Sequence, residues 1–259
     1  LQDAGPQTTL FYSPGRKNLS QYYAVSLRER ILGLAAGARL VSFDIFDTLL
    51  VRPWYAADNV FAFLEHKAAQ RFGIAHFALL RKQAEQLARQ QHPGVDVNIV
   101  QIYRALPSLA SCSEAQADAI MALERETELA MLHPHHEICE AARTLASQGK
   151  RLVLVSDMYL DSAFLRQVLA RHDLDFFDAL YVSNETGARK DTGAMWNLLP
   201  QHEQVEKSQW LHVGDNEHSD IQRPVDQGFL HPVHVLRAAD QFMLFNEEAA
   251  AWMAPGQWQ

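Results

Sequence analysis

The sequence has few cysteines, no excess of basic residues and no long apolar run. Its two cysteines, Cys112 and Cys139, fit no metal-binding spacing and are most simply reduced, which is typical of the cytoplasm. The formal net charge of −8 lacks the excess of basic residues that is typical of proteins that bind nucleic acid. No apolar run approaches the roughly 18 residues that a membrane span needs, and the first 30 residues lack a signal peptide's hydrophobic region. We therefore expect a cytoplasmic protein without a nucleic-acid partner or a membrane span.

What the sequence does contain is enough apolar material for a full core. Its 259 residues are 48% hydrophobic, which suits one α/β domain with a sizeable insertion. The chain begins with Leu1 rather than methionine, which fits a processed, trimmed or excised piece of a longer protein.

The most informative segment runs from Ser42 to Leu50. Residues 39–43 have the β-branched and aromatic content of a buried strand, so Asp44 would lie at the carboxyl end of that strand. In an open parallel sheet this edge binds ligands, and a carboxylate there can act as a nucleophile or a metal ligand. The alternative is that Asp44 caps the next turn and that Asp47 is an ordinary loop acid.

Two later segments repeat this design, with an apolar run that ends in polar or charged residues. Residues 151–155 lead into Ser156 and Asp157, where the hydroxyl and the backbone amides could hold an anion. Residues 179–182 lead to Lys190, a cation suited to a phosphoryl oxygen.

A fourth segment ends in an acid-rich loop. Residues 210–213 lead through Gly214 to Asp215 and Asp220, which could complete a site for a hard cation. Taken singly, each later segment has a plainer interpretation: a hydroxyl after a strand, a solvated lysine or a surface acidic turn. The ordered set of four segments is what carries the prediction.

The four segments, in this order and at these separations, resemble the motifs of the haloacid dehalogenase superfamily of hydrolases, which are mostly phosphatases. The resemblance covers roughly residues 38 to 235. It implies a doubly wound parallel α/β sheet with an inserted helical cap, and it implies that Asp44 is the nucleophile. By the same resemblance, phosphate is bound by the motif residues Ser156, Asp157, Lys190 and Thr48.

The resemblance also implies Mg²⁺ as the cofactor. The ion would be held by the side chains of Asp44 and Asp215 and by the backbone carbonyl of Phe46, with Asp220 behind them. The carbonyl is present whatever residue occupies position 46.

Position 46 departs from the usual Asp-x-Asp-x-Thr pattern of the family's phosphatases, in which the second Asp protonates the leaving oxygen and later activates water. Phe46 cannot transfer a proton. Asp47 follows it, with Thr48 in register behind. Asp47 could substitute as the acid/base only through a local bulge, because side chains two apart share a face and side chains three apart do not. The family's dehalogenases also place an aromatic residue at this position.

These observations predict a Mg²⁺-dependent phosphatase that acts on a small phosphorylated metabolite, of the sugar phosphate or nucleotide class, through a phospho-aspartate on Asp44. General acid catalysis contributes about 10²–10⁴-fold, so a good leaving group can react without it. One alternative is a dehalogenase-like hydrolase, which needs no Mg²⁺. The other is a catalytically weak accessory domain linked to polysaccharide or glycosyltransfer machinery, with a glycosyltransferase as a fused or neighbouring domain.

Residues 55–133 have a different sequence pattern from the segments on either side. Their apolar residues recur at helical spacing and show no strand pattern. Ser113 and Gln116 form a capping-box signature for a long helix that ends near Leu132. In the family, a helical cap that covers the active site and selects the substrate is inserted here. Its closure would exclude water, with hinges near residues 52–53 and 133–134.

The remaining residues predict a core of 38–54 and 134–238, in which strands and helices alternate as a doubly wound sheet requires. Residues 1–37 are predicted to be an N-terminal extension with an amphipathic helix from about residue 20 to residue 34. Residues 239–259 are predicted to be a tail with one short helix.

Two residues near the motifs are candidates for substrate contact. The guanidinium of Arg52, just past the first motif, could hold an anionic substrate group, although a surface role is the alternative. Tyr159 either lines the pocket or packs in the core. Asn184 and Asp157 flank the motifs and could orient the ligands.

Overall fold

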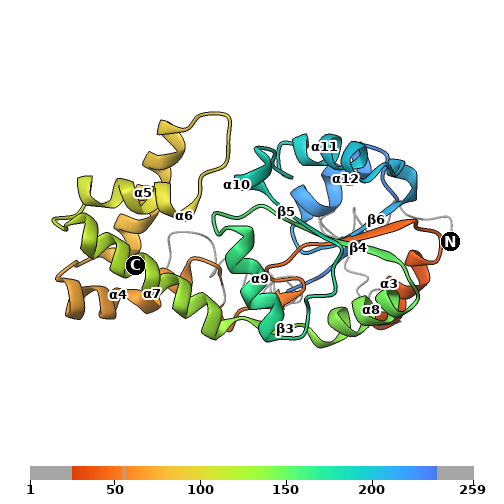
Figure 1. Cartoon of the computed structure of the whole chain (residues 1–259), viewed down its shortest axis with the longest axis horizontal. Coiled ribbons are helices and arrows are strands. Elements are labelled where there is room, and N and C mark those ends of the chain that lie inside the picture. Colours follow the sequence, from red (N-terminus) through yellow and green to blue (C-terminus); the bar gives the residue numbers. More distant parts are fainter. Residues whose placement is uncertain (1–24, 55, 238–259) are drawn as a thin grey trace, which may run out of the picture.

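The computed structural model of the protein describes residues 25–54 and 56–237. Figure 1 shows two parts: a sheet with helices on both faces, and a lobe of helices beside it. The helix expected from about residue 20 to residue 34 lies partly outside the described residues, and its described part is α3 (Leu27–Ala35). The tail helix expected within 239–259 lies outside them.

A five-stranded parallel sheet forms the centre of the larger part. Its spatial order is β5-β4-β1-β6-β7, and every neighbouring pair is parallel. The strands are β1 (Leu40–Phe43), β4 (Arg151–Ser156), β5 (Ala179–Val182), β6 (Trp210–Gly214) and β7 (Val233–His234). The strands that the four motifs predicted are all present, and the predicted doubly wound α/β fold is confirmed.

Helices cover both faces of this sheet. Figure 1 shows α3, α8 and α9 on one face, and α11 and α12 on the other. Beyond α3, the bounds are α8 (His136–Ser147), α9 (Ser162–Arg171), α10 (Ser183–Thr186), α11 (Ala194–Glu203) and α12 (Arg223–Asp226), with the short 3₁₀ turn η2 (Lys207–Gln209) before β6.

Successive side chains of the central strand enter different core clusters. Val41 packs into the same cluster as Leu165 of α9, whereas Leu40 packs with Trp196 of α11. This alternation follows from the pleat of a strand, which points neighbouring side chains to opposite faces. A strand buried on both faces contains an almost continuous apolar run, which is why the sequence identifies these strands readily.

The smaller part is a lobe of helices inserted after the first motif. Its helices are α4 (Asn59–Phe72), α5 (Phe77–Gln91), α6 (Ile99–Ala105) with the 3₁₀ turn η1 (Leu106–Ser108), and α7 (Glu114–Met131). The predicted capping box is confirmed: Ser113 Oγ accepts from the Gln116 N–H at 3.2 Å, and Gln116 Oε1 accepts from the Ser113 N–H at 2.9 Å. We call this lobe the helical insertion.

A short antiparallel ladder joins the two ends of the helical insertion. β2 (Leu50–Val51) pairs with β3 (His133–Pro134), with Leu50 opposite Pro134 and Val51 opposite His133. The sequence did not indicate this ladder, because two-residue strands leave no periodic pattern. The hinges predicted near residues 52–53 and 133–134 fall at or beside the ladder, and hinge motion there stays a prediction.

Across the described parts of the chain, no helix is both long and apolar enough to cross a membrane.

Candidate active site

The sheet topology brings the first and last motifs together. From β1 the chain continues to β4 on one side and later reaches β6 on the other, so the strand order reverses between β1 and β6. In open α/β sheets, ligands bind at such a point, outside the carboxyl ends of the strands. Asp44 directly follows β1 and Asp215 directly follows β6. The N–H of Asp44 also donates to the Val213 carbonyl at 2.9 Å, which fixes its backbone.

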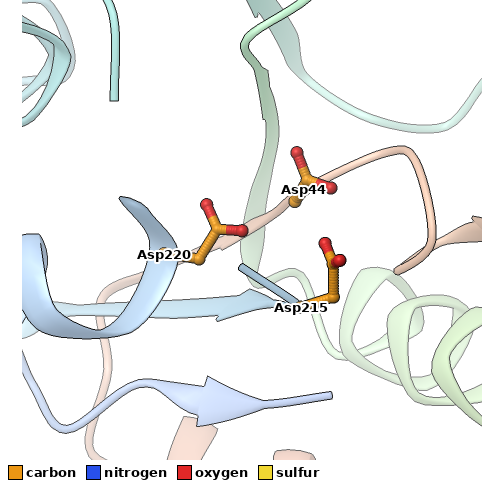
Figure 2. Close-up of side chains that lie close together, drawn as sticks. All are labelled: Asp44, Asp215 and Asp220. Atoms are coloured by element: carbon orange, nitrogen blue, oxygen red, sulfur yellow. The ribbon is translucent and has the colours of Figure 1, made fainter. Parts of the chain in front are cut away.

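Three carboxylates meet at this edge of the sheet. Asp44, Asp215 and Asp220 face one another in Figure 2, and one oxygen of each lies within 4.8 Å of the others. Asp220 belongs to η3 (Glu217–Gln222), a π-helical turn, and is fully buried. Gly214 leaves room for it, because a Cβ on Gly214 would lie 2.5 Å from the Asp220 Cβ. A larger residue at position 214 would therefore displace the Asp220 carboxylate.

Lys190 lies between two of these carboxylates. Its Nζ donates to Asp44 Oδ1 and to Asp220 Oδ1, each at 2.6 Å. Asp157 accepts from the backbone N–H of Lys190 at 2.9 Å and of Asp191 at 3.3 Å, so it holds the loop that carries the lysine. Burial disfavours the ammonium group, but Asp220 and Asp44 outweigh burial and raise the pKa of Lys190. The lysine is therefore charged and held against Asp44.

The carboxylates carry more negative charge than Lys190 balances. Burial raises the pKa of Asp44 to about 7, although Lys190 acts in the opposite direction. Burial, followed by the charges of Asp44 and Asp220, raises the pKa of Asp215 well above its usual range. Arg237, at 3.6 Å from Asp215, offsets only part of that effect. For Asp220, burial is outweighed by Lys190, and its pKa is lowered. Asp44 and Asp215 are thus the two carboxyl groups whose ionised forms lack a balancing cation.

Behind Asp220, a chain of buried polar groups runs into the core. His212 Nε2 lies 3.2 Å from Asp220 Oδ1, and His212 Nδ1 lies 2.7 Å from Ser42 Oγ. Trp210 Nε1 donates to the same Ser42 oxygen at 2.7 Å, so the Ser42 hydroxyl donates to His212 and the imidazole donates to Asp220. Burial lowers the pKa of His212, which keeps the ring neutral. These polar groups orient Asp220, and no sequence motif indicates them.

A tight turn follows Asp44. The Asp47 N–H donates to the Leu50 carbonyl and the Leu50 N–H donates to the Ile45 carbonyl, each at 2.7 Å. Asp47 closes this turn with a left-handed backbone, at φ 57°. Such a conformation is uncommon for a residue other than glycine, and Asp tolerates it better than most. Thr48 is buried, and its Oγ1 donates to Asp215 Oδ1 at 3.3 Å.

A cavity of about 320 Å³ opens at the carboxylates. This volume lies at the lower end of the range for small-molecule sites. Apart from Thr48, the predicted site residues all line it, namely Asp44, Phe46, Asp47, Arg52, Ser156, Asp157, Tyr159, Lys190, Asp215 and Asp220. The helical insertion contributes Ala57, Asp58, Phe61, Glu85 and Glu128. The cavity therefore lies between the sheet edge and the helical insertion.

Arg52 lines the cavity, but its guanidinium is engaged by protein groups. Nε and Nη2 donate to the two oxygens of Glu128 at 3.1 and 3.2 Å, and the planar group lies 4.2 Å above the centre of the Phe46 ring. A third nitrogen, Nη1, lies 3.7 Å from Asp47 Oδ2. The side chains of Arg52 and Glu128 are 4% and 1% exposed, so this is a buried ion pair. The predicted binding of a substrate anion by Arg52 would require breaking it.

Sequence reasoning missed Glu128, although α7 carries a signal for it. Glu124 and Glu128 lie one helical turn apart and are both buried, in phase with the apolar positions Ala117 and Ile120. Acidic residues on the buried face of a helix need basic partners, because a buried charge without a partner is costly. Glu124 finds its partner in Arg81, at 2.9 and 3.2 Å.

Tyr159 both lines the cavity and packs against the helical insertion. The Arg81 guanidinium lies 4.7 Å from the centre of its ring, and its carbonyl accepts from the Ile99 N–H at 2.8 Å. Asn184 Nδ2 donates to the carbonyls of Met158 and Leu160, at 2.6 and 2.9 Å, so Asn184 fixes the loop that carries Tyr159. The two alternatives for Tyr159, pocket and packing, therefore both describe part of its environment.

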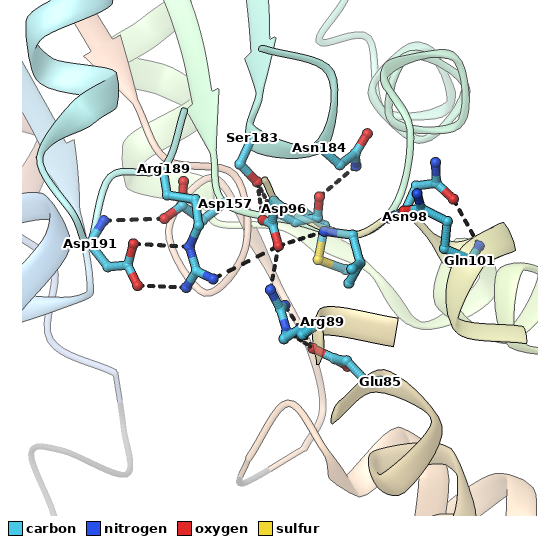
Figure 3. Close-up of polar contacts among 12 residues, drawn as sticks. Glu85, Arg89, Asp96, Asn98, Gln101, Asp157, Ser183, Asn184, Arg189 and Asp191 are labelled. Carbon is cyan, nitrogen blue, oxygen red and sulfur yellow. Dashed lines mark hydrogen bonds and ion pairs between the residues drawn. The ribbon is translucent and has the colours of Figure 1, made fainter. Parts of the chain in front are cut away.

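A buried acid also ties the helical insertion to the core, as Figure 3 shows. Asp96, between α5 and α6, accepts from Arg89 and from the Ser183 hydroxyl, each at 2.5 Å. Arg189 Nη1 lies 3.9 Å from the same carboxylate, and Arg189 directly precedes Lys190. Ser183 in turn accepts from the Met158 N–H at 3.0 Å. Asp96 thus contacts the segment of the third motif directly, and it reaches the segment of the second motif only through Ser183. No local sequence pattern marks Asp96.

Comparisons with known proteins agree with this architecture. Among solved structures, an L-2-haloacid dehalogenase from Xanthobacter autotrophicus is 20% identical, with 84% of this chain and 85% of that chain covered and a TM-score of 0.54. The HAD-hydrolase YfnB from Bacillus subtilis, in a crystal form bound to magnesium, is 17% identical, with coverage of 80% and 98% and a TM-score of 0.53. A protein of Haemophilus somnus 129PT described as a predicted phosphoglycolate phosphatase is 14% identical, with coverage of 79% and 92% and a TM-score of 0.50. At these identities the similarity shows the fold alone.

Sequence comparison decides the family. No curated protein matches the chain. The sequence model of the family described as haloacid dehalogenase-like hydrolase matches residues 38–222, which span more than half of the chain and contain all four motifs. The chain therefore belongs to the haloacid dehalogenase-like hydrolases.

Proposed function

We propose that this protein is a Mg²⁺-dependent phosphatase that hydrolyses a small phosphorylated metabolite through a phospho-aspartate on Asp44. The observation that carries the proposal is the cluster of Asp44, Asp215 and Asp220 around one lysine at the sheet edge. A nucleophilic carboxylate, a charge-neutralising ammonium group and a site for a hard cation are together what phosphoryl transfer needs.

The residues present fit Mg²⁺. Burial raises the pKa values of Asp44 and Asp215, because it disfavours their ionised forms. A bound cation would balance the negative charge of both carboxylates. Asp220 already accepts from Lys190 and from the Asn216 N–H at 3.1 Å, so it suits the supporting position. Asp44 and Asp215, with the Phe46 carbonyl, would hold the ion. When bound, Mg²⁺ would supply positive charge that stabilises the phosphoryl oxygens.

In the reaction that we propose, an Asp44 carboxylate oxygen attacks phosphorus and the bond to the leaving oxygen breaks. Lys190, which contacts both Asp44 and Asp220, offsets negative charge on the transferred group. Water then attacks the phosphorus of phospho-Asp44, which releases inorganic phosphate and restores the carboxylate.

We propose Asp47 as the proton donor to the leaving oxygen. Phe46 occupies the usual acid position and has no proton to give. The left-handed backbone of Asp47 is a local distortion of the kind that a side chain three residues after Asp44 needs to reach the same cavity, and Asp47 lines that cavity.

A dehalogenase-like reaction is the second candidate, and Phe46 is the observation that favours it, since a halide leaves without a proton. A 2-haloacid, however, carries a carboxylate. Around this cavity the basic groups Arg52, Lys190 and Arg237 each lie beside a protein carboxylate. This arrangement favours the phosphatase. A glycosyltransferase as a fused or neighbouring domain stays a prediction.

The test is a phosphatase screen over sugar phosphates, nucleotides and acyl phosphates, with and without Mg²⁺. We expect release of phosphate that requires both Mg²⁺ and Asp44, so the Asp44→Asn variant should lose at least about 10³-fold in kcat. Asp118→Asn, which changes an exposed acid of α7 that does not line the cavity, is the matched control. Halide release from 2-haloacids without Mg²⁺ would favour the second candidate, and no phosphate release from any compound would overturn the proposal.

A further inference from the structure

The charges around the cavity are strongly unequal. Among the residues that the structure describes, eight carboxylates line the cavity but only three basic side chains do, Arg52, Lys190 and Arg237. Lys190 contacts Asp44 and Asp220, so it serves the phosphoryl end of a substrate. Arg237 lies 3.6 Å from Asp215 at the same end. The rest of the substrate would therefore meet Arg52 and the helical insertion.

Arg52 is closed to a substrate anion by its existing partners. Its Nε and Nη2 donate to Glu128, its Nη1 lies near Asp47, and Phe46 covers one face of the guanidinium. An anionic group that took Arg52 from Glu128 would leave a carboxylate that is 1% exposed without its counter-ion. Breaking a buried pair in this way is strongly unfavourable.

On the side of the helical insertion, carboxylates line the cavity and their basic partners do not. Asp58 pairs with Lys82 at 2.7 Å. Glu85 pairs with Arg81 at 3.1 Å and with Arg89 at 2.8 Å. Of these five described residues, only the two acids line the cavity. The wall thus offers hydrogen-bond acceptors to a substrate while the compensating cations lie behind it.

We infer that the leaving group of the substrate is an uncharged polyol, and that phosphate esters with a carboxylate or a second phosphate in the leaving group are excluded. This inference rests on the proposed phosphatase function. Hydroxyl groups would donate to the carboxylates of Asp58 and Glu85, whereas a second anion would face these acids without a cation to balance it. Positive charge therefore lies at the phosphoryl end of the cavity, and hydrogen-bond acceptors lie at the end that would hold the leaving group.

The experiment compares two pairs of ligands that differ only in a terminal CH₂OH or COO⁻ group: glycerol 3-phosphate with 3-phosphoglycerate, and sorbitol 6-phosphate with 6-phosphogluconate. Calorimetry with Asp44→Asn protein and Mg²⁺ measures binding, and wild-type kcat/KM measures turnover. We expect each carboxylate member to bind at least about tenfold more weakly than its alcohol. Equal or tighter binding of the carboxylate members would overturn the inference and leave the phosphatase function standing. If no member binds and none is hydrolysed, the inference fails, and the wider phosphatase screen decides the phosphatase function by itself.

A substitution at Glu128 tests whether the Arg52–Glu128 pair causes the preference for the alcohol members. Glu128→Gln keeps the shape of the side chain but removes its charge, so Arg52 gains a free positive charge for substrate. We expect the preference for the alcohol members to fall by about tenfold. Glu114→Gln, which alters another Arg-paired glutamate of the helical insertion that does not line the cavity, should leave the preference unchanged. An unchanged preference in Glu128→Gln would contradict the role of the Arg52–Glu128 pair. If that variant does not fold, the wild-type ligand pairs still decide.

Discussion

Phe46 replaces the usual acid of the first motif, and its ring also packs against Arg52. Its ring supports one face of the Arg52 guanidinium at 4.2 Å, and Glu128 holds the edge of that guanidinium through two hydrogen bonds. A carboxylate in place of the ring would lie beside Arg52 and compete with Glu128 for it. The aromatic residue and the buried ion pair therefore belong together, and the proton donor has to come from elsewhere in the cavity.

The proposed role of Asp47 as proton donor predicts that the loss of kcat on replacing Asp47 depends on the leaving group. Asp47→Asn should lower kcat by about 10²-fold or more for alkyl phosphates, whose leaving oxygen needs a proton, and far less for p-nitrophenyl phosphate, whose leaving oxygen does not. Asp118→Asn, at an exposed position of α7 outside the cavity, should leave both rates unchanged. Rates for the two substrates measured with each variant check this. An equal loss for alkyl and aryl substrates in Asp47→Asn would show that Asp47 serves the structure of the turn rather than proton transfer.

At the residue scale, the sequence could identify those site residues that follow a strand within a motif. Asp44 and Asp215 directly follow a strand and Ser156 ends one, and strand ends in a parallel sheet necessarily meet at one edge. Lys190 lies beyond α10, and only its place in the third motif identifies it. Glu128 could not be assigned in this way. It reaches the cavity only because α7 packs beside Arg52, and such packing depends on residues far away in the sequence.

At the scale of elements, the loop between α5 and α6 connects the helical insertion to the loops of the core that line the cavity. Asp96 contacts Ser183 and Arg189, and the Ile99 N–H donates to the Tyr159 carbonyl at 2.8 Å. Lys190 directly follows Arg189. The placement of the helical insertion and the placement of Lys190 are therefore coupled through one buried carboxylate.

This coupling predicts that Asp96→Ala loosens the helical insertion and misplaces Lys190. Removal of this buried carboxylate leaves the Ser183 hydroxyl without its acceptor and costs about 1–3 kcal/mol of stability, and we expect kcat/KM to fall by at least about tenfold as well. Chemical denaturation, steady-state kinetics and hydrogen exchange over residues 95–100 measure these effects. Asp118→Ala, at an exposed position of α7, is the control. Wild-type exchange and kinetics in Asp96→Ala would show that the contact is dispensable.

At the scale of the whole molecule, the fold was largely predictable and the ladder between β2 and β3 was not. The sequence pattern predicts long buried strands such as β4 and helices with a stripe of apolar residues such as α7. Two-residue strands form only because other elements bring them together. The same holds for η3, whose π-helical turn depends on Asp220 packing against Gly214.

The stability of the metal-free molecule should fall as the pH rises from about 4 to about 7. The folded-state pKa of Asp44 is about 7, above its ordinary value of 3.8, and that of Asp215 is raised as well. Between these values the folded state binds more protons than the unfolded state, so the free energy of unfolding decreases by up to about 1.4 kcal/mol per pH unit and per group. Mg²⁺ replaces those protons, so its stabilising effect should grow with pH.

Thermal denaturation with and without millimolar Mg²⁺ tests this, at about pH 5.5 and about pH 8. We expect the increase in Tm to be larger at the higher pH, and to be much reduced in Asp215→Asn. An increase that is the same at both pH values would show that the ion does not compete with protons for these carboxylates.

The ladder between β2 and β3 has a consequence for how the molecule can change. Because Val51 and His133 are opposite each other in an antiparallel pair, the whole helical insertion is, in topological terms, the loop of a β-hairpin. Hairpin loops can be lengthened, shortened or exchanged without altering the register of the strands that carry them. A different loop can therefore be grafted onto the same two strands without changing their register, provided that the new loop supplies a partner for Ser183 and Arg189 in place of Asp96.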